Sequence, residues 1–291
     1  MRILVIGGSG FLGHRLISRL SEGENDLVAA VRATPNSRIP RCSYIAVDEL
    51  TSRGLSDLPP FDVIINAAMK RSSKTNPVLD STLRRLNFEI PFEIIRAYSK
   101  EDTLVINTST YIQNFGGVKG HTIEGYAASK ELLSNALEMA TLNGDFRTID
   151  LYLFTLFGPG DRNTHLVPLL LSAIKNQTSV SLSGGNQLIN LLYIDDAVDN
   201  IVAAFEIEYK GYSAYHLWEP NYLSIRDLVS FIENYFRKSL NVSWGDLPYN
   251  GHEMFEPWAI PLQKFPLFSQ NTSLSEGLER IRSFDLSRDA L

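Results

Sequence analysis

The sequence contains one cysteine, Cys42, in 291 residues. A single cysteine excludes an intramolecular disulfide, a thiolate zinc cluster and a CxxC redox pair, and it fits a reducing compartment. The five histidines are scattered and form no HExxH pattern, so we expect no metal site. Basic residues number 27 against 33 acidic ones, and the net charge of −6 argues against a nucleic-acid partner, which needs a basic excess.

No apolar run is long enough to span a membrane. The longest, residues 166–174, is broken by Pro168 and Ser172 and falls far short of the ~20 residues that a spanning helix needs. Residues 1–6 lead directly into a strand pattern, without the basic, apolar and small-residue succession of a signal peptide. We therefore expect a cytoplasmic protein with no membrane partner.

The N-terminal half alternates short apolar runs with helical patterns. Because the runs are continuous, they indicate strands that are buried on both faces of a sheet. Strands that alternate with helices predict a parallel sheet with helices on both sides and a ligand site at the edge where the strands end. The strand-like runs are residues 2–6, 27–31, 44–47, 62–66, 103–107 and 148–153.

Helical periodicity is clear over residues 122–143 and extends over residues 79–98, where Pro91 predicts a kink or a helix start. The C-terminal half is irregular and rich in proline and glycine. We predict an α/β fold: a Rossmann-type doubly wound parallel sheet with a smaller, irregular C-terminal domain. The sheet domain is predicted over residues 1–157 and about 186–207, and the smaller domain over residues 158–185 and 208–291.

A glycine-rich turn, Gly-Gly-Ser-Gly-Phe-Leu-Gly, follows the first strand pattern and opens a helix. Its GxxGxxG spacing suits a tight turn, a close approach of the backbone to a pyrophosphate, and close packing of helix on strand. The alternative is a plain glycine-rich connection, but the strand before it and the helix after it favour dinucleotide binding. We expect the cofactor to contact Gly7, Gly10, Phe11, Leu12 and Gly13.

The end of the second strand pattern indicates which nicotinamide cofactor binds. NAD-binding folds carry an acidic residue there for the ribose hydroxyls, whereas this chain has Arg32. A guanidinium pairs well with a 2′-phosphate, so Arg32 predicts NADP(H), unless it is a solvated surface arginine. Asp48, after the third strand pattern, is expected to meet the adenine or to cap a helix.

Tyr126 and Lys130 lie four residues apart in a helical pattern, so their side chains share one helix face. A phenol is a poor acid at neutral pH, but a nearby ammonium stabilises the phenolate and lowers its pKa. The hydroxyl of Thr108, which follows the fifth strand pattern, can hold a substrate carbonyl. The trio predicts proton donation to a carbonyl under hydride reduction; a buried aromatic beside a solvated lysine is the structural alternative.

These residues together resemble the extended short-chain dehydrogenase/reductase family (the NAD-dependent epimerase/dehydratase family), in its nucleotide-sugar branch. The resemblance covers nearly the whole chain. It rests on the glycine turn, Asn66-Ala67-Ala68, Asn87, the Tyr126 and Lys130 pair, Phe157-Gly158-Pro159-Gly160-Asp161 and Tyr193-Ile194-Asp195-Asp196.

The resemblance implies roles for single residues. Tyr126 would be the acid–base, Lys130 would bind the nicotinamide ribose, and Thr108 would hold the carbonyl, with Ser109 as the alternative hydroxyl. Ala67, Tyr126 and Lys130 would join the glycine turn in contacting the cofactor. The larger domain would then bind NADP and the smaller one the substrate, and helices of the 79–98 and 122–143 type imply a homodimer.

Departures from the family pattern narrow the reaction. Ser109-Thr110 stand where the 4,6-dehydratases carry an Asp-Glu pair, so we exclude water elimination. Arg32 argues against the NAD-retaining epimerases and decarboxylases. What remains is NADPH-dependent reduction of the 4-keto group of a nucleotide-linked deoxysugar, similar to the CDP-paratose and CDP-abequose synthases of O-antigen biosynthesis.

The substrate side departs too. Ile189-Asn190 replace an Arg-Asp pair near the substrate, so a diphosphate contact is expected to move to Arg162, Lys264 or another arginine. Residues 244–249 resemble the loop over the nucleotide base, or else are a core tryptophan and a turn. The rival functions are an NAD-retaining epimerase, a catalytically silent NADP-binding regulator, and a reductase of a small non-sugar ketone.

Overall fold

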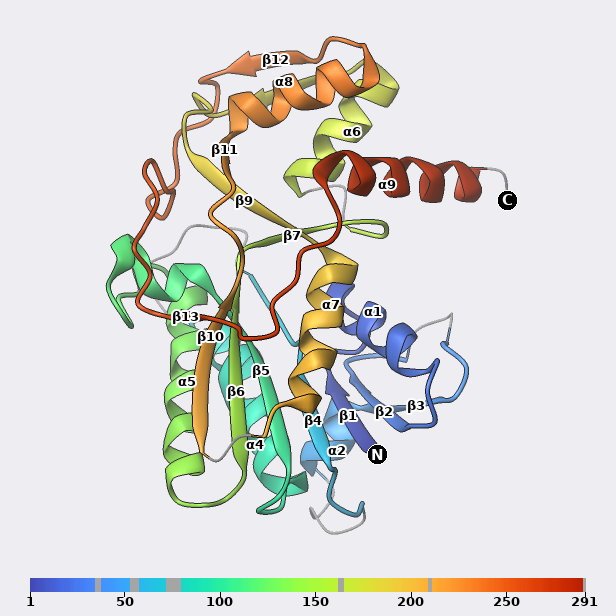
Figure 1. The fold of residues 1–291 in the computed structure, drawn as a ribbon, viewed down its shortest axis with the longest axis vertical. Coiled ribbons are helices and arrows are strands. Elements are labelled where there is room, and N and C mark those ends of the chain that lie inside the picture. The colour runs from blue at the N-terminus through green and yellow to red at the C-terminus, as the bar shows by residue number, and fades with distance from the viewer. Residues whose placement is uncertain (35–37, 53–57, 72–79, 162–164, 209–210, 290–291) are drawn as a thin grey trace. The chain divides into compact units, whose positions relative to one another are not determined.

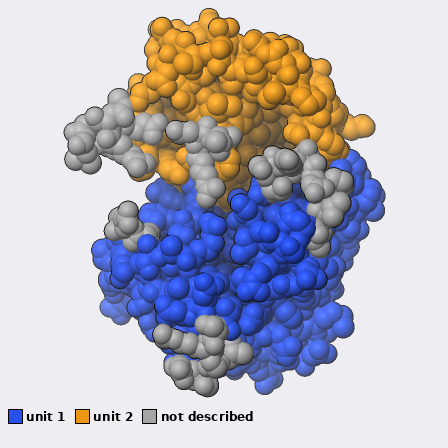
Figure 2. Space-filling view, turned by 180° about the vertical axis from the view of Figure 1, so that it is seen from behind, with its two compact units in different colours: residues 1–153, 198–217, 260–268 blue, residues 154–197, 218–259, 269–291 orange. Residues whose placement is uncertain are grey.

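The computed structural model describes residues 1–34, 38–52, 58–71, 80–161, 165–208 and 211–289. Within them the chain forms two compact units, which Figure 2 colours separately. Unit 1 comprises residues 1–153, 198–217 and 260–268, and unit 2 comprises residues 154–197, 218–259 and 269–291.

Unit 1 is built on an eight-stranded sheet in the order β13-β10-β6-β5-β4-β1-β2-β3, with every neighbouring pair parallel (Figure 1). This arrangement confirms the predicted Rossmann-type fold. Each predicted strand is present with its ends moved by at most three residues. The strands are β1 (Arg2–Ile6), β2 (Asp26–Val31), β3 (Cys42–Ala46), β4 (Val63–Asn66), β5 (Leu104–Thr110), β6 (Arg147–Leu153), β10 (Tyr212–Leu217) and β13 (Gln263–Lys264).

Helices cover both faces of this sheet. One face packs on α2 (Val47–Ser52), α4 (Ile90–Tyr98) and α5 (Gly125–Leu142), in a buried apolar cluster that includes Leu4, Ile64 and Leu133. On the other face α1 (Phe11–Leu20) lies against β2, where Ile17 approaches Ala29. Because both faces are covered, the strands are apolar throughout, which is why their runs are continuous in the sequence.

The second predicted helix is present, with a change of pitch before Pro91. It runs through α3 (Ser81–Arg84), the π-helical turn η1 (Arg85–Glu89) and α4. Pro91 has no N–H to donate and its ring crowds the carbonyl four residues before it, so a regular α-helical bond cannot form there. The wider turn accommodates this, with the Ile90 N–H donating to the Arg85 carbonyl five residues back.

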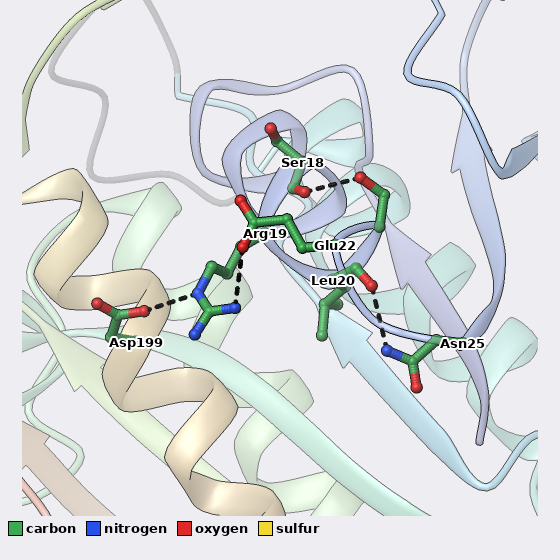
Figure 3. Close-up of polar contacts among 7 residues, drawn as sticks. Ser18, Arg19, Leu20, Glu22, Asn25 and Asp199 are labelled. Atoms are coloured by element: carbon green, nitrogen blue, oxygen red, sulfur yellow. Dashed lines mark hydrogen bonds and ion pairs between the residues drawn. The ribbon is translucent and has the colours of Figure 1, made fainter.

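The return of the chain to unit 1 is fixed by α7 (Ile194–Ala203), which the short turn η3 (Ala204–Glu206) follows. Figure 3 shows Arg19 of α1 between Glu22, at 3.2 Å, and Asp199 of α7, at 3.1 Å. The side chain of Asn25 closes the end of α1 by donating to the Leu20 carbonyl. Ion pairs this exposed contribute little stability, so they align α7 with α1 rather than hold it.

Unit 2 consists of small sheets and helices. One sheet has the order β11-β9-β7, and the other pairs β12 with β8. The strands are β7 (Thr155–Phe157), β8 (Ser179–Leu182), β9 (Leu188–Tyr193), β11 (Tyr222–Ser224) and β12 (Asn241–Trp244), and the helices are α6 (Leu166–Asn176), α8 (Ile225–Phe236) and α9 (Leu274–Asp289).

The boundaries of the units differ from the predicted ones. The sequence predicts residues 154–157 and 186–197 in the sheet domain, yet they belong to unit 2, because β7 and β9 pair with each other and not with the large sheet. Residues 212–217 and 263–264, predicted in the smaller domain, instead form β10 and β13 of the large sheet. Strand pairing over such sequence distances leaves no local pattern.

Candidate active site

The glycine turn joins β1 to α1 in a conformation that side chains would block. Gly7 has a φ of +84°, and a Cβ there would lie 2.7 Å from the Ala68 Cα. A Cβ on Gly13 would lie 2.2 Å from the Gly7 carbonyl oxygen. A Cβ on Gly10 would lie 3.2 Å from that same oxygen and meet no other described atom outside its own helix and chain neighbours within 4 Å. Gly7 and Gly13 are thus required by close packing, while Gly10 leaves its outer side free.

The first turn of α1 suits an anion. Gly10 is its N-cap and provides no side-chain cap, and no acidic residue occurs in the turn. The N–H groups at Phe11 and Leu12 therefore have no side-chain partner from the cap, and the helix dipole adds partial positive charge. This arrangement fits a dinucleotide pyrophosphate. Leu12 and Gly13 are buried and Phe11 is half-buried.

The segment after β4 lies between the glycine turn and α5. The Ala67 N–H donates to the Ile6 carbonyl of β1 at 2.9 Å, and the Ala68 N–H donates to the Asn66 side chain at 3.2 Å. The Ala68 carbonyl accepts a hydrogen bond from Lys130 of α5. The structure therefore brings together three segments that together span more than 120 residues of the sequence.

Lys130 is fixed below the surface, with 2% of its area exposed. Its Nζ donates to the carbonyl oxygens of Ala68 and Thr108, each at 2.9 Å. Burial lowers the pKa of Lys130 to about 8, and the nearby Asp150 carboxyl partly opposes that shift. An ammonium has three donors, so one remains for a ligand.

Tyr126 lies one helical turn before Lys130 and is half-buried. Its hydroxyl has no hydrogen bond to any residue in the described part of the chain. Burial raises the pKa of this phenol, the Arg71 guanidinium opposes the shift, and the Glu124 carboxylate adds to it. A phenol that stays protonated at neutral pH and has no internal partner is suited to donate a proton.

The two candidate hydroxyls of β5 face different surroundings. Thr108 Oγ1 donates to the Asn66 carbonyl at 2.9 Å, beside the segment that Lys130 contacts. Ser109 Oγ lies 3.1 Å from Ser134 Oγ and accepts from the Asn107 amide at 3.1 Å. Ser109 is thus part of a buried cluster with Asn107 and Ser134 of α5. Thr108 is therefore the better placed of the two to hold a carbonyl.

Sequence reasoning missed a row of polar side chains beneath the site. Asn66, Asn107 and Asp150 are register partners on β4, β5 and β6, and none of them has any exposed area. The Asn66 amide donates to Asn107 Oδ1 at 2.8 Å, and the Asn107 amide donates to Asp150 Oδ1 at 2.9 Å. Tyr212 Oη of β10 donates to Asp150 Oδ2 at 3.0 Å. Burial raises the pKa of Asp150, against these hydrogen bonds.

The signal for this row was available in part. Asn66 and Asn107 are the polar residues that follow two apolar runs, and Asp150 interrupts a third. Their alignment depends on the strand order, which no single run contains. The carboxylate can only accept, so it sets which way each amide faces along the row, as far as the Ala68 N–H.

The predicted adenosine-side residues lie farther along the same sheet edge. Arg32 follows β2 directly and is exposed, two residues after Ala30, whose carbonyl accepts from the Gly7 and Gly8 N–H groups. Asp48 lies in the first turn of α2, just after β3, and is exposed. Arg32 thus follows the strand next to β1, and Asp48 follows the strand one place farther out in the sheet order.

The predicted substrate-side residues are spread over both units. In unit 2 the Arg226 guanidinium stacks 4.3 Å from the Trp244 ring centroid, and its Nε donates to the Gly184 carbonyl. Tyr249 is partly exposed, at 39%. Lys264 belongs to β13 of unit 1, and Arg162 falls outside the described residues.

No cluster of three or more histidine, cysteine or acidic side chains in the described residues could hold a metal ion. Within the same residues, every helix is too short or too polar to cross a bilayer.

Comparison with known proteins adds three findings. A model of the NAD dependent epimerase/dehydratase family matches residues 3–215. The chain is 26% identical over 269 residues to a CDP-abequose synthase of Yersinia pseudotuberculosis, covering 88% of this chain and 92% of that one. It is 22% identical to a CDP-abequose synthase of Salmonella typhimurium, covering 80% of each chain.

Among solved structures, the fold is similar to a UDP-glucuronic acid 4-epimerase of Bacillus cereus in complex with UDP-glucuronic acid and NAD. The TM-score is 0.79 at 20% identity, over 99% of this chain and 100% of the other. At this identity the likeness concerns the fold.

Proposed function

The chain belongs to the NAD dependent epimerase/dehydratase family, and from this premise we propose that it uses NADPH to reduce the 4-keto group of a nucleotide-linked deoxysugar. The observation that carries the proposal is the arrangement of Tyr126 and Lys130. The tyrosine hydroxyl is unbonded among the described residues, and the lysine ammonium is fixed one turn away with one donor to spare. The two relatives named CDP-abequose synthase support a nucleotide-sugar substrate.

The cofactor would lie along the edge of the unit 1 sheet. The backbone at Gly7, Gly10, Phe11, Leu12 and Gly13 would hold its pyrophosphate at the start of α1. In unit 1, Ala67 and Lys130 would lie against the nicotinamide riboside, Arg32 against the 2′-phosphate and Asp48 near the adenine. When bound, the cofactor supplies the hydride that reduces the carbonyl.

Three side chains would handle the carbonyl oxygen. Thr108 Oγ1 would turn from the Asn66 carbonyl to the substrate oxygen and stabilise the developing negative charge. Tyr126 would donate its proton to that oxygen as the alkoxide forms. Lys130 would stabilise the phenolate that remains, because its ammonium is held in place by two backbone carbonyls.

NADPH is preferred over NADH on the strength of Arg32. A cation at the end of β2 suits a 2′-phosphate, and no acidic residue stands there for the ribose hydroxyls. The similar solved structure holds NAD and is an epimerase. That likeness favours an NAD-retaining nucleotide-sugar epimerase as the second candidate function.

Unit 1 would be the cofactor-binding part and unit 2 the substrate-binding part. We also propose a homodimer through the outer face of α5, where Leu132, Met139 and Leu142 are exposed at 37%, 61% and 71%. Apolar residues this exposed on one helix are typical of an interface. Sedimentation equilibrium tests it: a monomer at all concentrations would refute the dimer.

The test of function measures cofactor consumption. The purified protein is incubated with NADPH or NADH and a panel of CDP-, dTDP- and UDP-linked 4-keto-deoxysugars, and absorbance at the reduced nicotinamide band is followed. We expect one NADPH oxidised per sugar, with at least one member of the panel. Tightly bound NAD in the purified protein, with a changed sugar configuration and no net oxidation, would establish the epimerase instead.

A further inference from the structure

We propose that Arg71 is a second cation of the proton-donor site, held over the Tyr126 ring so that it stabilises the phenolate left by proton transfer. The guanidinium carbon lies 5.2 Å from the ring centroid. Arg71 follows the Asn66-Ala67-Ala68 segment by three residues, so it reaches Tyr126 from the β4 side, whereas Lys130 belongs to α5, the helix that carries Tyr126.

The position of Arg71 is set by a buried asparagine. Asn87, in the π-helical turn η1, has no exposed area, and its side chain hydrogen-bonds to both the N–H and the carbonyl of Lys70. Its Oδ1 accepts from the Lys70 N–H at 2.7 Å, and its Nδ2 donates to the Lys70 carbonyl at 2.8 Å. The residue that follows this fixed peptide is Arg71, so the direction in which its side chain leaves the backbone is fixed as well.

The same asparagine ties that peptide to α5. Its Nδ2 also lies 2.9 Å from Ser129 Oγ, and this hydroxyl donates to the Tyr126 carbonyl at 2.7 Å. Asn87 therefore connects the backbone next to Arg71 with the helical turn that carries Tyr126 and Lys130. The π-helical turn before Pro91 places Asn87 at this point, and such turns are frequent at functional sites.

The charges around the phenol come from three elements. Arg71 acts on it from the segment after β4 and Glu124 from the residue before α5, while Lys130 lies one turn farther along α5 and has Asp150 of β6 nearby. Burial of Tyr126 disfavours the phenolate, and Glu124 disfavours it further, so cations are needed beside it. A cation over an aromatic face is attracted by the neutral ring and more strongly by the phenolate.

Arg71 thus acts through Tyr126: its charge stabilises the phenolate, whereas Tyr126 itself donates the proton. As far as it names Tyr126 the donor, this inference rests on the proposed function. The electrostatic contact itself is a property of the protein without substrate. Because Arg71 is exposed, its effect is screened by salt and is expected to be moderate.

The test titrates Tyr126 directly. The protein is labelled with tyrosine carrying ¹³C at Cζ, the Tyr126 resonance is assigned with Tyr126→Phe, and its pKa is measured by NMR at low ionic strength. The Arg71→Met variant should raise the pKa of Tyr126 by about 0.5 to 1 pH unit, the shift expected of a partly screened charge at this distance. Arg71→Lys should retain at least half of the wild-type effect, because it keeps the charge.

The matched control is Lys70→Met, which removes the same charge one residue away and leaves the backbone held by Asn87 unchanged. It should move the Tyr126 pKa by less than about 0.2 unit, and 0.5 M salt should shrink the Arg71→Met effect. An unchanged or lowered pKa in Arg71→Met, or equal shifts in both variants, would overturn the proposal. These outcomes need no substrate, so they are independent of whether the reductase reaction itself is found.

If the reaction is found, the pH dependence of kcat/KM provides a second test. The Lys130 ammonium, with a pKa of about 8, loses its proton before the phenol does, so kcat/KM should fall in two alkaline steps. Reduction needs the protonated phenol, and Arg71→Met should move the upper step, which reports the phenol, to higher pH by the same amount. A loss of activity that is equal at every pH would mean that Arg71 has only a structural role.

Discussion

Two parts of the candidate site differ in how many of their polar atoms are hydrogen-bonded within the protein. The buried base, which comprises Asn66, Asn107, Lys130 and Asp150, is at most 2% exposed, and its members are bonded to one another or to the backbone. The rim, which comprises Arg32, Arg71 and Tyr126, reaches the surface, and the Tyr126 hydroxyl is unbonded among described residues. The difference teaches that the base fixes geometry, while the rim keeps its bonding capacity for ligands.

The energetics of the two parts follow from this difference. Removing one member of the base leaves buried partners without hydrogen bonds, which costs stability. Removing a side chain of the rim leaves few other polar atoms without a hydrogen-bond partner. The fold is therefore unaffected, while the chemistry or the binding changes. Substitutions in the base and the rim should therefore separate activity from stability.

The largest separation is expected for Tyr126→Phe. Loss of the proton donor should lower kcat by about 1,000-fold, roughly 4 kcal/mol in the barrier, while urea unfolding changes by less than about 0.5 kcal/mol. Tyr235→Phe is the control, because that hydroxyl donates to Glu279 within unit 2. Retention of most activity by Tyr126→Phe would remove this residue from the mechanism.

The base should give the opposite result. Asp150→Leu strands the Asn107 amide and the Tyr212 hydroxyl and leaves Lys130 without its nearby carboxyl, so the free energy of unfolding should fall by about 3 kcal/mol. Tyr212→Phe removes a single donor and should cost about 1 kcal/mol. Urea unfolding of both variants measures this. A neutral Asp150→Leu would mean that the row of hydrogen bonds does not hold the sheet edge.

An effect smaller than those of Tyr126→Phe and Asp150→Leu concerns the far end of the rim. Arg32→Asp should weaken NADPH binding by about 30-fold, near 2 kcal/mol, and leave NADH binding and urea unfolding within twofold and about 0.5 kcal/mol of wild type. Calorimetric titration with each cofactor measures it. Arg96→Asp on the outer side of α4 makes the same charge change elsewhere. Equal losses of affinity for both cofactors would mean that Arg32 does not bind the 2′-phosphate.

The sequence predicts what is local in this molecule. Local patterns are enough to predict the glycine turn, the first six strands and the Tyr126 and Lys130 pair, because each of them occupies one short stretch of the sequence. Pro91 also predicted the change of pitch in its helix, although not that a π-helical turn would bring Asn87 to the site.

What escaped prediction depends on pairing between distant segments. β10 is a half-polar run that joins the large sheet through β6, and β9 leaves that sheet for β7. The Asn66, Asn107 and Asp150 row exists only once three strands are in register. Arg71 likewise lies over the Tyr126 ring in the folded chain, where Asn87 holds the neighbouring Lys70 backbone.

The most direct measurement follows the transferred hydrogen. NADPH doubly deuterated at nicotinamide C4 is mixed with the protein and a nucleotide-linked 4-keto-deoxysugar, and the product is analysed by NMR and mass spectrometry. We predict one deuterium, at C4 of the sugar, for each NADPH oxidised. A product without deuterium, formed while NADPH stays reduced, would contradict the reductase account.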